Sequence, residues 1–567
     1  MEPDAGRQSA GAHSGRVARG AGENRPGVGL RPGAGESEEQ HQPCFPDPAG
    51  ARLPDRRGPR ELRGLSERPG GDQHRARALL HGYRGGHPGG RRSGFHCSQS
   101  DGDFRFAARR CSLKSARPVA AGIRTVNYPH IPEELLPNGL LVQTIEDHRF
   151  PIVSVQVAFP VGRVHNPDDN LALLQLAVES VKEGTESRDA RTIADQMDYW
   201  SIHYSGELFM ESTLYAIRAL EQHLERGLEI LGDLLLNPVF PEDELEKTRE
   251  RWSSLLQAQR SQSDFLANER AYLSCFEGHP YSKSTIPLEH LQQATRGRLL
   301  ESYREKYSPD GALVLFAGDV THEDSVRLAR RFFGKWKSSS TARMEYSTAS
   351  SRPKQILLVE RPNSVQSRVL IAARALPVAD PGMIDLRVAN QILGGSASAR
   401  LFLKLREEKG FTYGAYSRLK TYREDGLLMA GAGVRSDVTG QAIDEILLEF
   451  DRMVDGLPSD EELSRSQSEI IGAFIRQMET PSSIGALEIR RRLGGLPVDY
   501  YRNLPSAVQQ VTPEMVRGIS RRVFRGSEPV VIVVGDRQAV ENQLKHLGEI
   551  ELFDSQGKRL STPQMKA

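Results

Sequence analysis

The segment Gln391 to Ser417, QILGGSASARLFLKLREEKGFTYGAYS, decides the fold and carries the first candidate site. Its middle mixes leucines with charged residues in the spacing of a short amphipathic helix, and glycines suited to helix ends lie on both sides. After Gly410 apolar residues occupy alternate positions, which predicts a half-buried strand. We therefore expect Arg406 in the last turn of a helix and Tyr413 at the start of the following strand.

Arg406 and Tyr413 together suggest a site that donates hydrogen bonds, because a tight turn at Gly410 would direct both into one cleft. A guanidinium and a phenol suit a peptide carbonyl, or the oxyanion that the carbonyl becomes during hydrolysis. A structural interpretation is also open, since arginine is favourable at a helix C-terminus and tyrosine is common in strands. From spacing alone, the structural interpretation is the more common one.

The same segment resembles the second-half signature of the pitrilysin/insulinase metallopeptidases, the inverzincins. In that family a Gly-Gly turn precedes S-R-L-F, then R-E, K-G and a tyrosine at this spacing. NPVFPEDELEKTRER (Asn237 to Arg251) and GHPYS (Gly278 to Ser282) resemble further family segments, and the likeness extends from about Leu136 to Leu552. It implies an α+β fold of two related halves, each a mainly antiparallel sheet with helices packed on one face, forming a clam-shell around a cleft.

The resemblance also implies that the zinc site of the family is degenerate here. In the family, H-x-x-E-H on a first-half helix supplies two zinc-binding histidines and a glutamate that activates water, and a later glutamate is the third ligand. Aligned through the Gly-Thr pair that follows the motif, the histidines fall on Gln175 and Glu179 and the motif's glutamate on Val178. Counting forward into the helix after Pro238 places the third ligand near Leu255. Glu179 alone would not hold zinc against water, so no metal or other cofactor is expected in this chain.

The arginine and tyrosine of the family, which reach substrate at the zinc from the other half, map onto Arg406 and Tyr413. Some family members divide the work between two chains, and this sequence resembles the chain that carries the arginine and tyrosine. The leading hypothesis is a non-catalytic subunit of a heteromeric zinc endopeptidase, inactive by itself. It would add an extended peptide or unfolded protein to a sheet edge and supply both side chains to the zinc site of a homologous, H-x-x-E-H-bearing partner.

Two other functions are open. One is a catalytically inert scaffold or assembly subunit that keeps the peptidase fold, which predicts a large apolar interface and no affinity for peptides. The other is a peptidase that is active alone, which needs a metal site that the sequence does not contain. In the leading hypothesis, zinc is expected in the partner subunit.

Similar segments recur along the chain and indicate a duplication. The Gly-Asp pairs that end at Asp319 and Asp536 lie 217 positions apart, and the strands around Ser154 and Ser367 lie 213 apart. Only two copies of this length imply two related domains and not a solenoid. We expect a first domain over 126–337, a linker over 338–353, a second domain over 354–555 and a flexible tail over 556–567.

Periodicity predicts the main elements of the first half. Two strands are expected on either side of His148 to Pro151. Further strands are expected over Leu208–Tyr215 and Gly311–Gly318, and helices over Asn170–Lys182, Thr192–Met197, Ala219–Leu236, Pro241–Arg260 and Leu291–Tyr307.

Residues 1–125 differ in composition from the rest of the chain. They contain 21 Arg and one Lys against 13 acidic residues, a net charge of +9, whereas the residues beyond 125 carry −8. The Gly, Arg and Pro content predicts disorder. A misassigned or extended start, an inert linker and a nucleic-acid-binding arm are the explanations, in that order, so no nucleic-acid partner is expected.

Cysteines and apolar runs give little information about the compartment. Three of the four cysteines precede residue 126, and Cys275 alone cannot form an internal disulfide. No run of 18 apolar residues occurs, so no membrane span is expected. No secretory signal pattern is visible, and the bacterial periplasm or cell envelope is only a guess.

Overall fold

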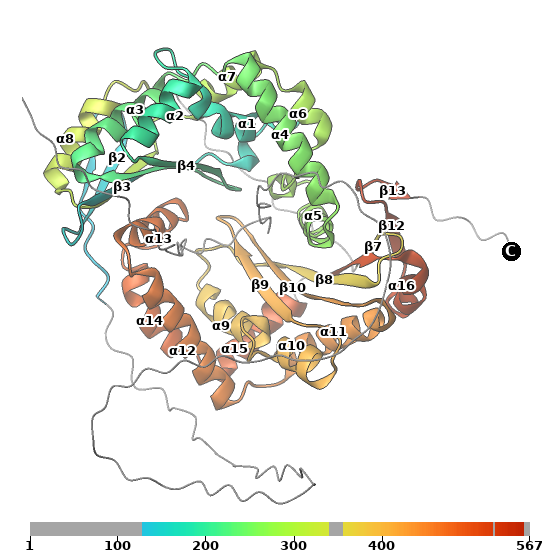
Figure 1. Cartoon of the computed structure of the whole chain (residues 1–567). Helices are drawn as coiled ribbons and strands as arrows, with labels where there is room; N and C mark the ends of the chain where they lie inside the picture. The colour runs from blue at the N-terminus through green and yellow to red at the C-terminus, as the bar shows by residue number, and fades with distance from the viewer. Residues whose placement is uncertain (1–126, 339–354, 526–527, 561–567) are drawn as a thin grey trace, which may run out of the picture. The chain divides into compact units, whose positions relative to one another are not determined.

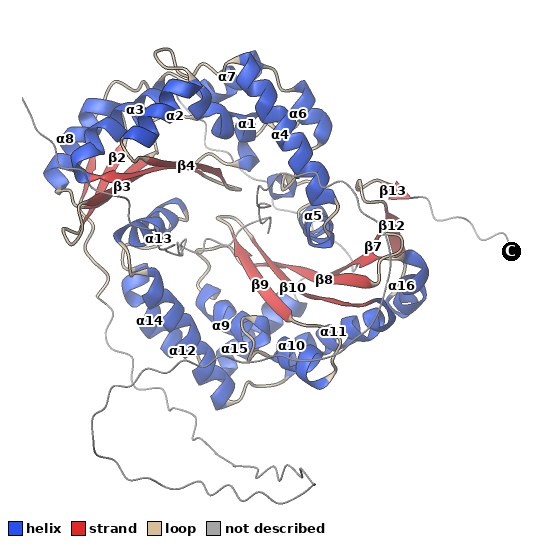
Figure 2. Cartoon of the chain, in the orientation of Figure 1, coloured by secondary structure: helices blue, strands red, loops and turns tan. Residues whose placement is uncertain are grey.

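The computed structural model describes residues 127–338, 355–525 and 528–560, all of which belong to the same compact unit. The N-terminal segment 1–125 and all but the first residue of the expected linker lie outside these residues. The described part contains two mixed sheets (Figure 1), each packed with helices (Figure 2). The predicted α+β class with two related halves is confirmed.

The first sheet has six strands in the order β1-β2-β6-β3-β5-β4. β2 and β6 run parallel, and the other neighbours run antiparallel. The apolar run of β6 is buried along its whole length, as expected for a central strand covered on both faces. The strands are β1 (Glu133–Leu135), β2 (Leu141–Glu146), β3 (Ile152–Phe159), β4 (His203–Leu208), β5 (Thr213–Leu220) and β6 (Leu313–Gly318).

Most of the helices of the first half pack on one face of this sheet (Figure 2). They are α1 (Leu173–Ser180), α2 (Ala190–Tyr199), α3 (Leu224–Leu236), α4 (Glu242–Arg260), α5 (Ser263–Cys275), α6 (Leu288–Gln293), α7 (Arg296–Lys306) and α8 (His322–Phe333).

The second sheet has seven strands in the order β13-β12-β7-β11-β8-β10-β9. The strands are β7 (Gln355–Glu360), β8 (Gln366–Ala375), β9 (Ala415–Thr421), β10 (Gly426–Arg435), β11 (Val530–Gly535), β12 (Ile550–Phe553) and β13 (Arg559–Leu560). The helices are α9 (Met383–Gly394), α10 (Arg400–Phe402), α11 (Thr439–Asp455), α12 (Asp460–Gln477), α13 (Pro481–Leu493), α14 (Tyr500–Gln509), α15 (Pro513–Ser520) and α16 (Arg537–Leu544).

The two sheets repeat one arrangement. The order β2-β6-β3-β5-β4 of the first sheet recurs as β7-β11-β8-β10-β9 in the second. In each sheet the first two of these strands pair in parallel and the remaining neighbours pair antiparallel. The order of the strands therefore agrees with the duplication that the repeated sequence segments indicated.

One helix of each half packs on the sheet of the other half. Helix α5 places Ala271 in an apolar cluster with Ile532 of the second sheet. Helix α13 places Ile489 against Leu315 of the first sheet. A buried hydrogen bond between Gln143 of β2 and Glu488 of α13, 2.9 Å long, adds a polar contact to this exchange.

Three of the elements predicted for the first half differ substantially from the structure. The strand expected over Leu208–Tyr215 is two strand ends around a turn, because Phe209 N donates to the Ser212 carbonyl and closes a hairpin. The helix expected from Ala219 begins at Leu224, since Ala219 still pairs in β5. The helix expected over Leu291–Tyr307 is broken where Thr295 caps α7 by accepting from Arg298 N.

Two further observations concern the expected C-terminal tail and the apolar character of the helices. Residues 559 and 560 of the expected tail form β13, which pairs antiparallel with β12. Among the described residues, no helix combines the length and the apolar character needed to cross a bilayer.

Candidate functional site

The positions that the sequence analysis aligned with the zinc motif lie on α1 and on α4, two helices that pack together. Gln175 is buried, with 5% of its surface exposed, and its amide nitrogen donates to Glu179 Oε1 at 3.4 Å. Val178 is 1% exposed and belongs to the apolar core, and Leu255 is half-buried. The polar pair on α1 is therefore not a solvent-facing pair, since Gln175 is buried and Glu179 half-buried.

Two arginines that the sequence did not single out contact this polar pair. Arg163, in the turn after β3, donates from Nη2 to Gln175 Oε1 at 3.5 Å. Arg251 Nη2 on α4 lies 3.3 Å from Glu179 Oε2. Burial raises the pKa of the Glu179 carboxyl, and the charge of Arg251 opposes that rise. A guanidinium therefore lies at each end of the pair.

The donors at these positions do not fit zinc. One amide, one carboxylate already paired with an arginine, and two aliphatic side chains provide no set of three metal ligands. Within residues 127–338, 355–525 and 528–560, no group of three or more His, Cys, Asp or Glu side chains is placed to hold a metal ion. This region offers cationic hydrogen-bond donors in place of metal ligands.

Arg406 lies in a widened helical turn. Helix α10 continues without a break into the π-helical turn η5 (Leu403–Glu408), a geometry that often occurs at functional sites. The Arg406 side chain is 47% exposed, and its Nε lies 3.4 Å from Glu407 Oε1. Its guanidinium carbon lies 4.8 Å from the ring centroid of Phe402. The buried Phe402 ring thus supports a guanidinium that reaches solvent.

Tyr413 lies in a loop and not in the strand where it was expected. Gly410 closes the turn with φ of +64°, and β9 begins only at Ala415. Thr412 Oγ1 donates to the Gly433 carbonyl at 2.7 Å, and this side-chain bond replaces regular strand pairing before Ala415. Tyr413 is 91% exposed, and in the described part of the chain its hydroxyl has no hydrogen-bond partner.

The structure brings Arg406 and Tyr413 to the two sides of one turn, and both reach solvent. Among the residues described, no hydrogen bond or ring contact joins them. The two side chains are therefore separate donors, each available to a group that approaches the turn from outside.

Profiles of one peptidase family match both halves of the chain. The profile described as insulinase, peptidase family M16, matches residues 141–287. The profile described as the peptidase M16 inactive domain matches residues 293–470. Together they cover more than half of the chain. This chain belongs to peptidase family M16.

Two relatives illustrate the range of similar proteins. The uncharacterized zinc protease YmxG of Bacillus subtilis is 23% identical over 398 residues, which are 68% of this chain and 94% of that protein. A probable mitochondrial-processing peptidase subunit beta of Arabidopsis thaliana is 20% identical over 446 residues, covering 75% and 83% of the two chains.

Solved structures agree with the M16 fold. The peptidase M16 inactive domain from Pseudomonas fluorescens superposes with a TM-score of 0.68 at 19% identity, covering 72% of this chain and 98% of that chain. A protease from Helicobacter pylori superposes with a TM-score of 0.67 at 16% identity, covering 72% and 100%. At these identities the likeness concerns the fold.

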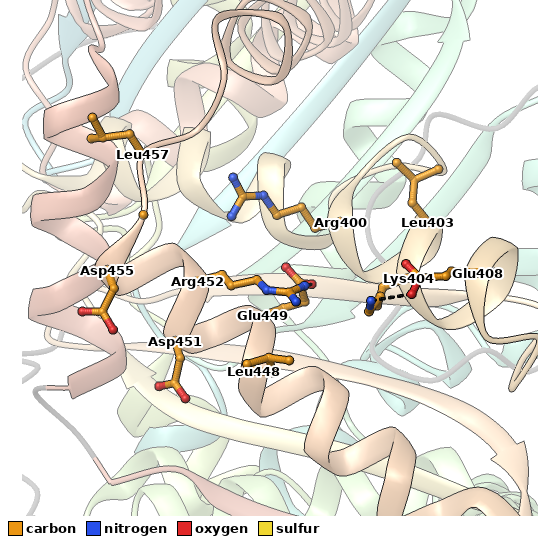
Figure 3. Close-up of a pocket in the computed structure, with 11 residues that line it drawn as sticks. Arg400, Leu403, Lys404, Glu408, Leu448, Glu449, Asp451, Arg452, Asp455 and Leu457 are labelled. Atoms are coloured by element: carbon orange, nitrogen blue, oxygen red, sulfur yellow. Dashed lines mark hydrogen bonds and ion pairs between the residues drawn. The ribbon is translucent and has the colours of Figure 1, made fainter.

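A groove adjoins the helical segment of this M16 chain that carries Arg406 (Figure 3). It is open and has a volume of about 830 Å³. Figure 3 shows Arg400, Leu403, Lys404 and Glu408 from α10 and η5 on one side, and side chains of α11 on the other. The sequence did not indicate this groove, because its two sides are about 40 residues apart in the chain.

Proposed function

We propose that this chain is the non-catalytic, substrate-binding subunit of a heteromeric M16 zinc endopeptidase. Arg406 and Tyr413 donate hydrogen bonds to the peptide carbonyl, or to its oxyanion, at the zinc site of a homologous partner that bears H-x-x-E-H. The zinc belongs to the partner, and this chain is inactive by itself. The supporting observation is a contrast: the motif positions on α1 are filled by side chains unsuited to zinc, while Arg406 and Tyr413 reach solvent.

The peptide would bind as an added strand. β4 is the edge of the first sheet and pairs only with β5 in the described residues. Its outer N–H and C=O groups are the ready template that an edge strand presents to an extended segment. An extended peptide or an unfolded protein segment therefore suits this edge better than a folded domain does.

The test compares the full chain alone with the full chain mixed with an H-x-x-E-H-bearing M16 homologue from the same genome. Cleavage of a quenched peptide library and zinc content are measured in both. We expect activity in the mixture and neither activity nor stoichiometric zinc in the chain alone. Activity with bound zinc in the chain alone would overturn the proposal.

Two substitutions test the donors directly. Arg406→Ala and Tyr413→Phe should each lower turnover of the mixture on the order of 10²-fold, as loss of one oxyanion donor does, without preventing assembly. Arg418→Ala and Tyr416→Phe are matched controls, because both side chains are exposed on the neighbouring strand β9. Equal rates for the test and control variants would mean that the pair is structural.

The second candidate is a scaffold or assembly subunit, and the groove beside η5 favours it. Three leucines line that groove and are each between 42% and 46% exposed, namely Leu403, Leu448 and Leu457. If the mixture assembles but Arg406→Ala leaves turnover unchanged, an assembly role through such a surface becomes the better explanation.

A further inference from the structure

We propose that Glu211 and Tyr281 form a latch that holds the β9–β10 turn of the second half against the first half. This turn ends the same hairpin whose first strand follows Tyr413, so the latch also positions the Tyr413 loop. The inference rests on hydrogen bonds and ring contacts alone and is independent of the role proposed for Tyr413.

The turn presents two backbone donors that it does not use itself. Tyr422 N donates to the Asp425 carbonyl at 2.9 Å and closes a four-residue turn. In such a turn the N–H groups of the two central residues, Arg423 and Glu424, point outward and need acceptors. Both residues are exposed, so water is the alternative acceptor, and acceptors supplied by the protein hold the turn in place of water.

Both acceptors come from the first half. Arg423 N donates to the Glu211 carboxylate at 3.1 Å (Oε1) and 3.0 Å (Oε2). Glu424 N donates to the Tyr281 hydroxyl at 3.1 Å. The Tyr281 hydroxyl in turn donates to Glu211 Oε1 at 2.5 Å, which links the two acceptors. The two consecutive N–H groups of the turn therefore bind a carboxylate and a hydroxyl that are hydrogen-bonded to each other.

Aromatic contacts surround this polar centre. The Tyr281 side chain is fully buried, and its ring centroid lies 4.7 Å from that of Tyr422. The Tyr422 hydroxyl lies 2.5 Å from the Tyr272 hydroxyl of α5. On the other side, Arg374 Nε donates to Asp425 Oδ2 at 2.8 Å and ties the turn to β8 of its own sheet. The turn is therefore rigid within the second half and docked on three segments of the first.

The two docked turns are equivalent parts of the duplicated fold. Glu211 belongs to the β4–β5 turn, and Arg423 to the β9–β10 turn that holds the same place in the second sheet. β9 is an edge strand and pairs only with β10 in the described residues. Docking the turn at its far end therefore restrains a strand that has a single neighbour, and the Tyr413 loop precedes that strand.

Hydrogen exchange of the full chain, followed by mass spectrometry, tests the latch. Glu211→Ala should speed exchange of the Arg423 and Glu424 amides about tenfold or more. The Arg423 amide loses its carboxylate acceptor, and the Glu424 amide is bonded to a Tyr281 hydroxyl that loses its own hydrogen bond to that carboxylate. The peptide that covers Leu405 to Tyr416 should also exchange faster. Glu424→Gln is the matched control: it removes a carboxylate from the same turn and leaves the backbone contacts in place.

A second variant keeps the test decisive if Glu211→Ala does not fold. Tyr281→Phe removes only the hydroxyl and should speed exchange at Glu424 more than at Arg423. Exchange of β6 should stay unchanged in each variant, which shows that the fold is intact. Unchanged exchange of the turn in folded Glu211→Ala and Tyr281→Phe would overturn the latch. Faster exchange confined to the turn, with Leu405 to Tyr416 unaffected, would overturn the positioning of the Tyr413 loop.

Discussion

The two halves share a strand order but differ in the side chains at equivalent places. Helix α1 follows β3 in the first half, and α9 follows the equivalent strand β8 in the second. On α1, the buried Gln175 and the half-buried Glu179 bond to each other and to arginines. On α9, Val388 and Ile392 are buried in an apolar cluster. The polar pair on α1 is therefore not required by the fold, since the equivalent helix buries two apolar side chains, Val388 and Ile392.

The segments that precede the edge strands β4 and β9 also differ between the two halves. The segment before β9 exposes Arg406 and Tyr413, while α2 and the turn after it hold the equivalent place before β4. One half thus carries a polar pair at the positions aligned with the metal motif, and the other presents two donors to solvent. The two halves therefore share a backbone arrangement and differ in the polar side chains that they place on it.

The largest predicted effect comes from placing metal ligands at the aligned positions on α1 and α4. Gln175→His, Glu179→His and Leu255→Glu, combined in one variant, should change zinc content from none to one ion per chain, because the set then matches two histidines and one carboxylate. Zinc retained after dialysis is the measurement. No peptidase activity should appear, because Val178 still takes no proton.

Arg251 provides the control for this reconstruction. Its guanidinium lies 3.3 Å from the Glu179 carboxylate, so it would place a positive charge beside the restored ligand. Adding Arg251→Leu should increase the affinity for zinc on the order of 10-fold or more. The positive charges of a guanidinium and a zinc ion a few ångströms apart repel by several kcal/mol at an effective permittivity near 20. Absence of zinc from both variants would show that the positions assigned to the three ligands are wrong.

The sequence predicted the duplication because short patterns of neighbouring residues mark the equivalent strands of the two halves. Gly318 and Gly535 end the central strands β6 and β11, where continuous apolar runs mark burial on both faces. The exchange of α5 and α13 was not predicted, because an amphipathic pattern shows that a helix buries one face and not which sheet covers it. Arg163 was missed for a related reason: its contact with Gln175 depends on how the turn after β3 folds back.

The Tyr413 loop shows a different limit of the sequence analysis. Alternating apolar residues predicted that the strand began before Tyr413, but the Thr412 side chain bonds to the Gly433 carbonyl of β10 and delays regular pairing to Ala415. Such side-chain bonds to a distant backbone group leave no periodic trace. The residue types of the candidate site were available from the sequence, and their exposure was not.

The next effect tests the exchanged helix α13. A Cβ atom on Gly485 would lie 2.6 Å from Leu315 Cδ2 in the buried core of the first sheet. Gly485→Val should therefore push α13 away from β6 and lower the free energy of unfolding by about 3 kcal/mol, the upper part of the usual cost of overpacking. Chemical denaturation at neutral pH measures the change.

Gly472→Val is the matched control for this substitution. Gly472 lies within α12 of the same half, and the nearest atom to its Cβ would be Arg476 Nη1 at 3.6 Å. We expect a change within about 0.5 kcal/mol for this variant, as for most surface substitutions. A loss for Gly485→Val as small as the one for Gly472→Val would show that α13 is held to the first sheet loosely enough to move aside.

A smaller effect separates the turns after β3 and β8 by their pH dependence. In the first half, His165 Nδ1 accepts from Gly162 N at 3.0 Å, and burial lowers the pKa of His165 to about 4. In the second half, Asp380 Oδ1 accepts from Gly382 N, and the hydrogen bond from Arg522 lowers the pKa of Asp380. One turn depends on a neutral histidine and the other on a charged carboxylate.

The sign of the histidine effect follows from linkage. The folded state binds fewer protons at His165 than the unfolded state does, so its stabilising contribution is complete above the unfolded pKa of about 6.5 and is lost as pH falls toward 4. Unfolding should cost about 2 kcal/mol less at pH 5 than at pH 7. His165→Gln should abolish most of that difference, whereas Asp380→Asn should leave it in place, because the Asp380 contribution is lost only below its unfolded pKa near 3.8. Similar slopes in the wild-type protein and His165→Gln would contradict the assignment.

The smallest effect concerns the helices α4 and α12, which hold equivalent places after α3 and α11. Helix α12 begins with a capping box in which Ser459 accepts from Glu462 N, and Glu462 also binds Arg400 at 2.7 Å. Helix α4 begins at Glu242, and its N-cap residue Pro241 provides no side-chain cap.

Ser459→Ala should therefore destabilise the protein by about 1 kcal/mol, the usual cost of a lost cap, in thermal or chemical unfolding. Pro241→Ser tests the same difference from the other side, since it offers α4 a cap that it lacks, and should be neutral or slightly stabilising. Because Arg400 begins the helix that carries Arg406, the loss at Ser459 should be accompanied by faster amide exchange in α10 and η5. A loss of stability without that change would place the capping box outside the support of Arg406.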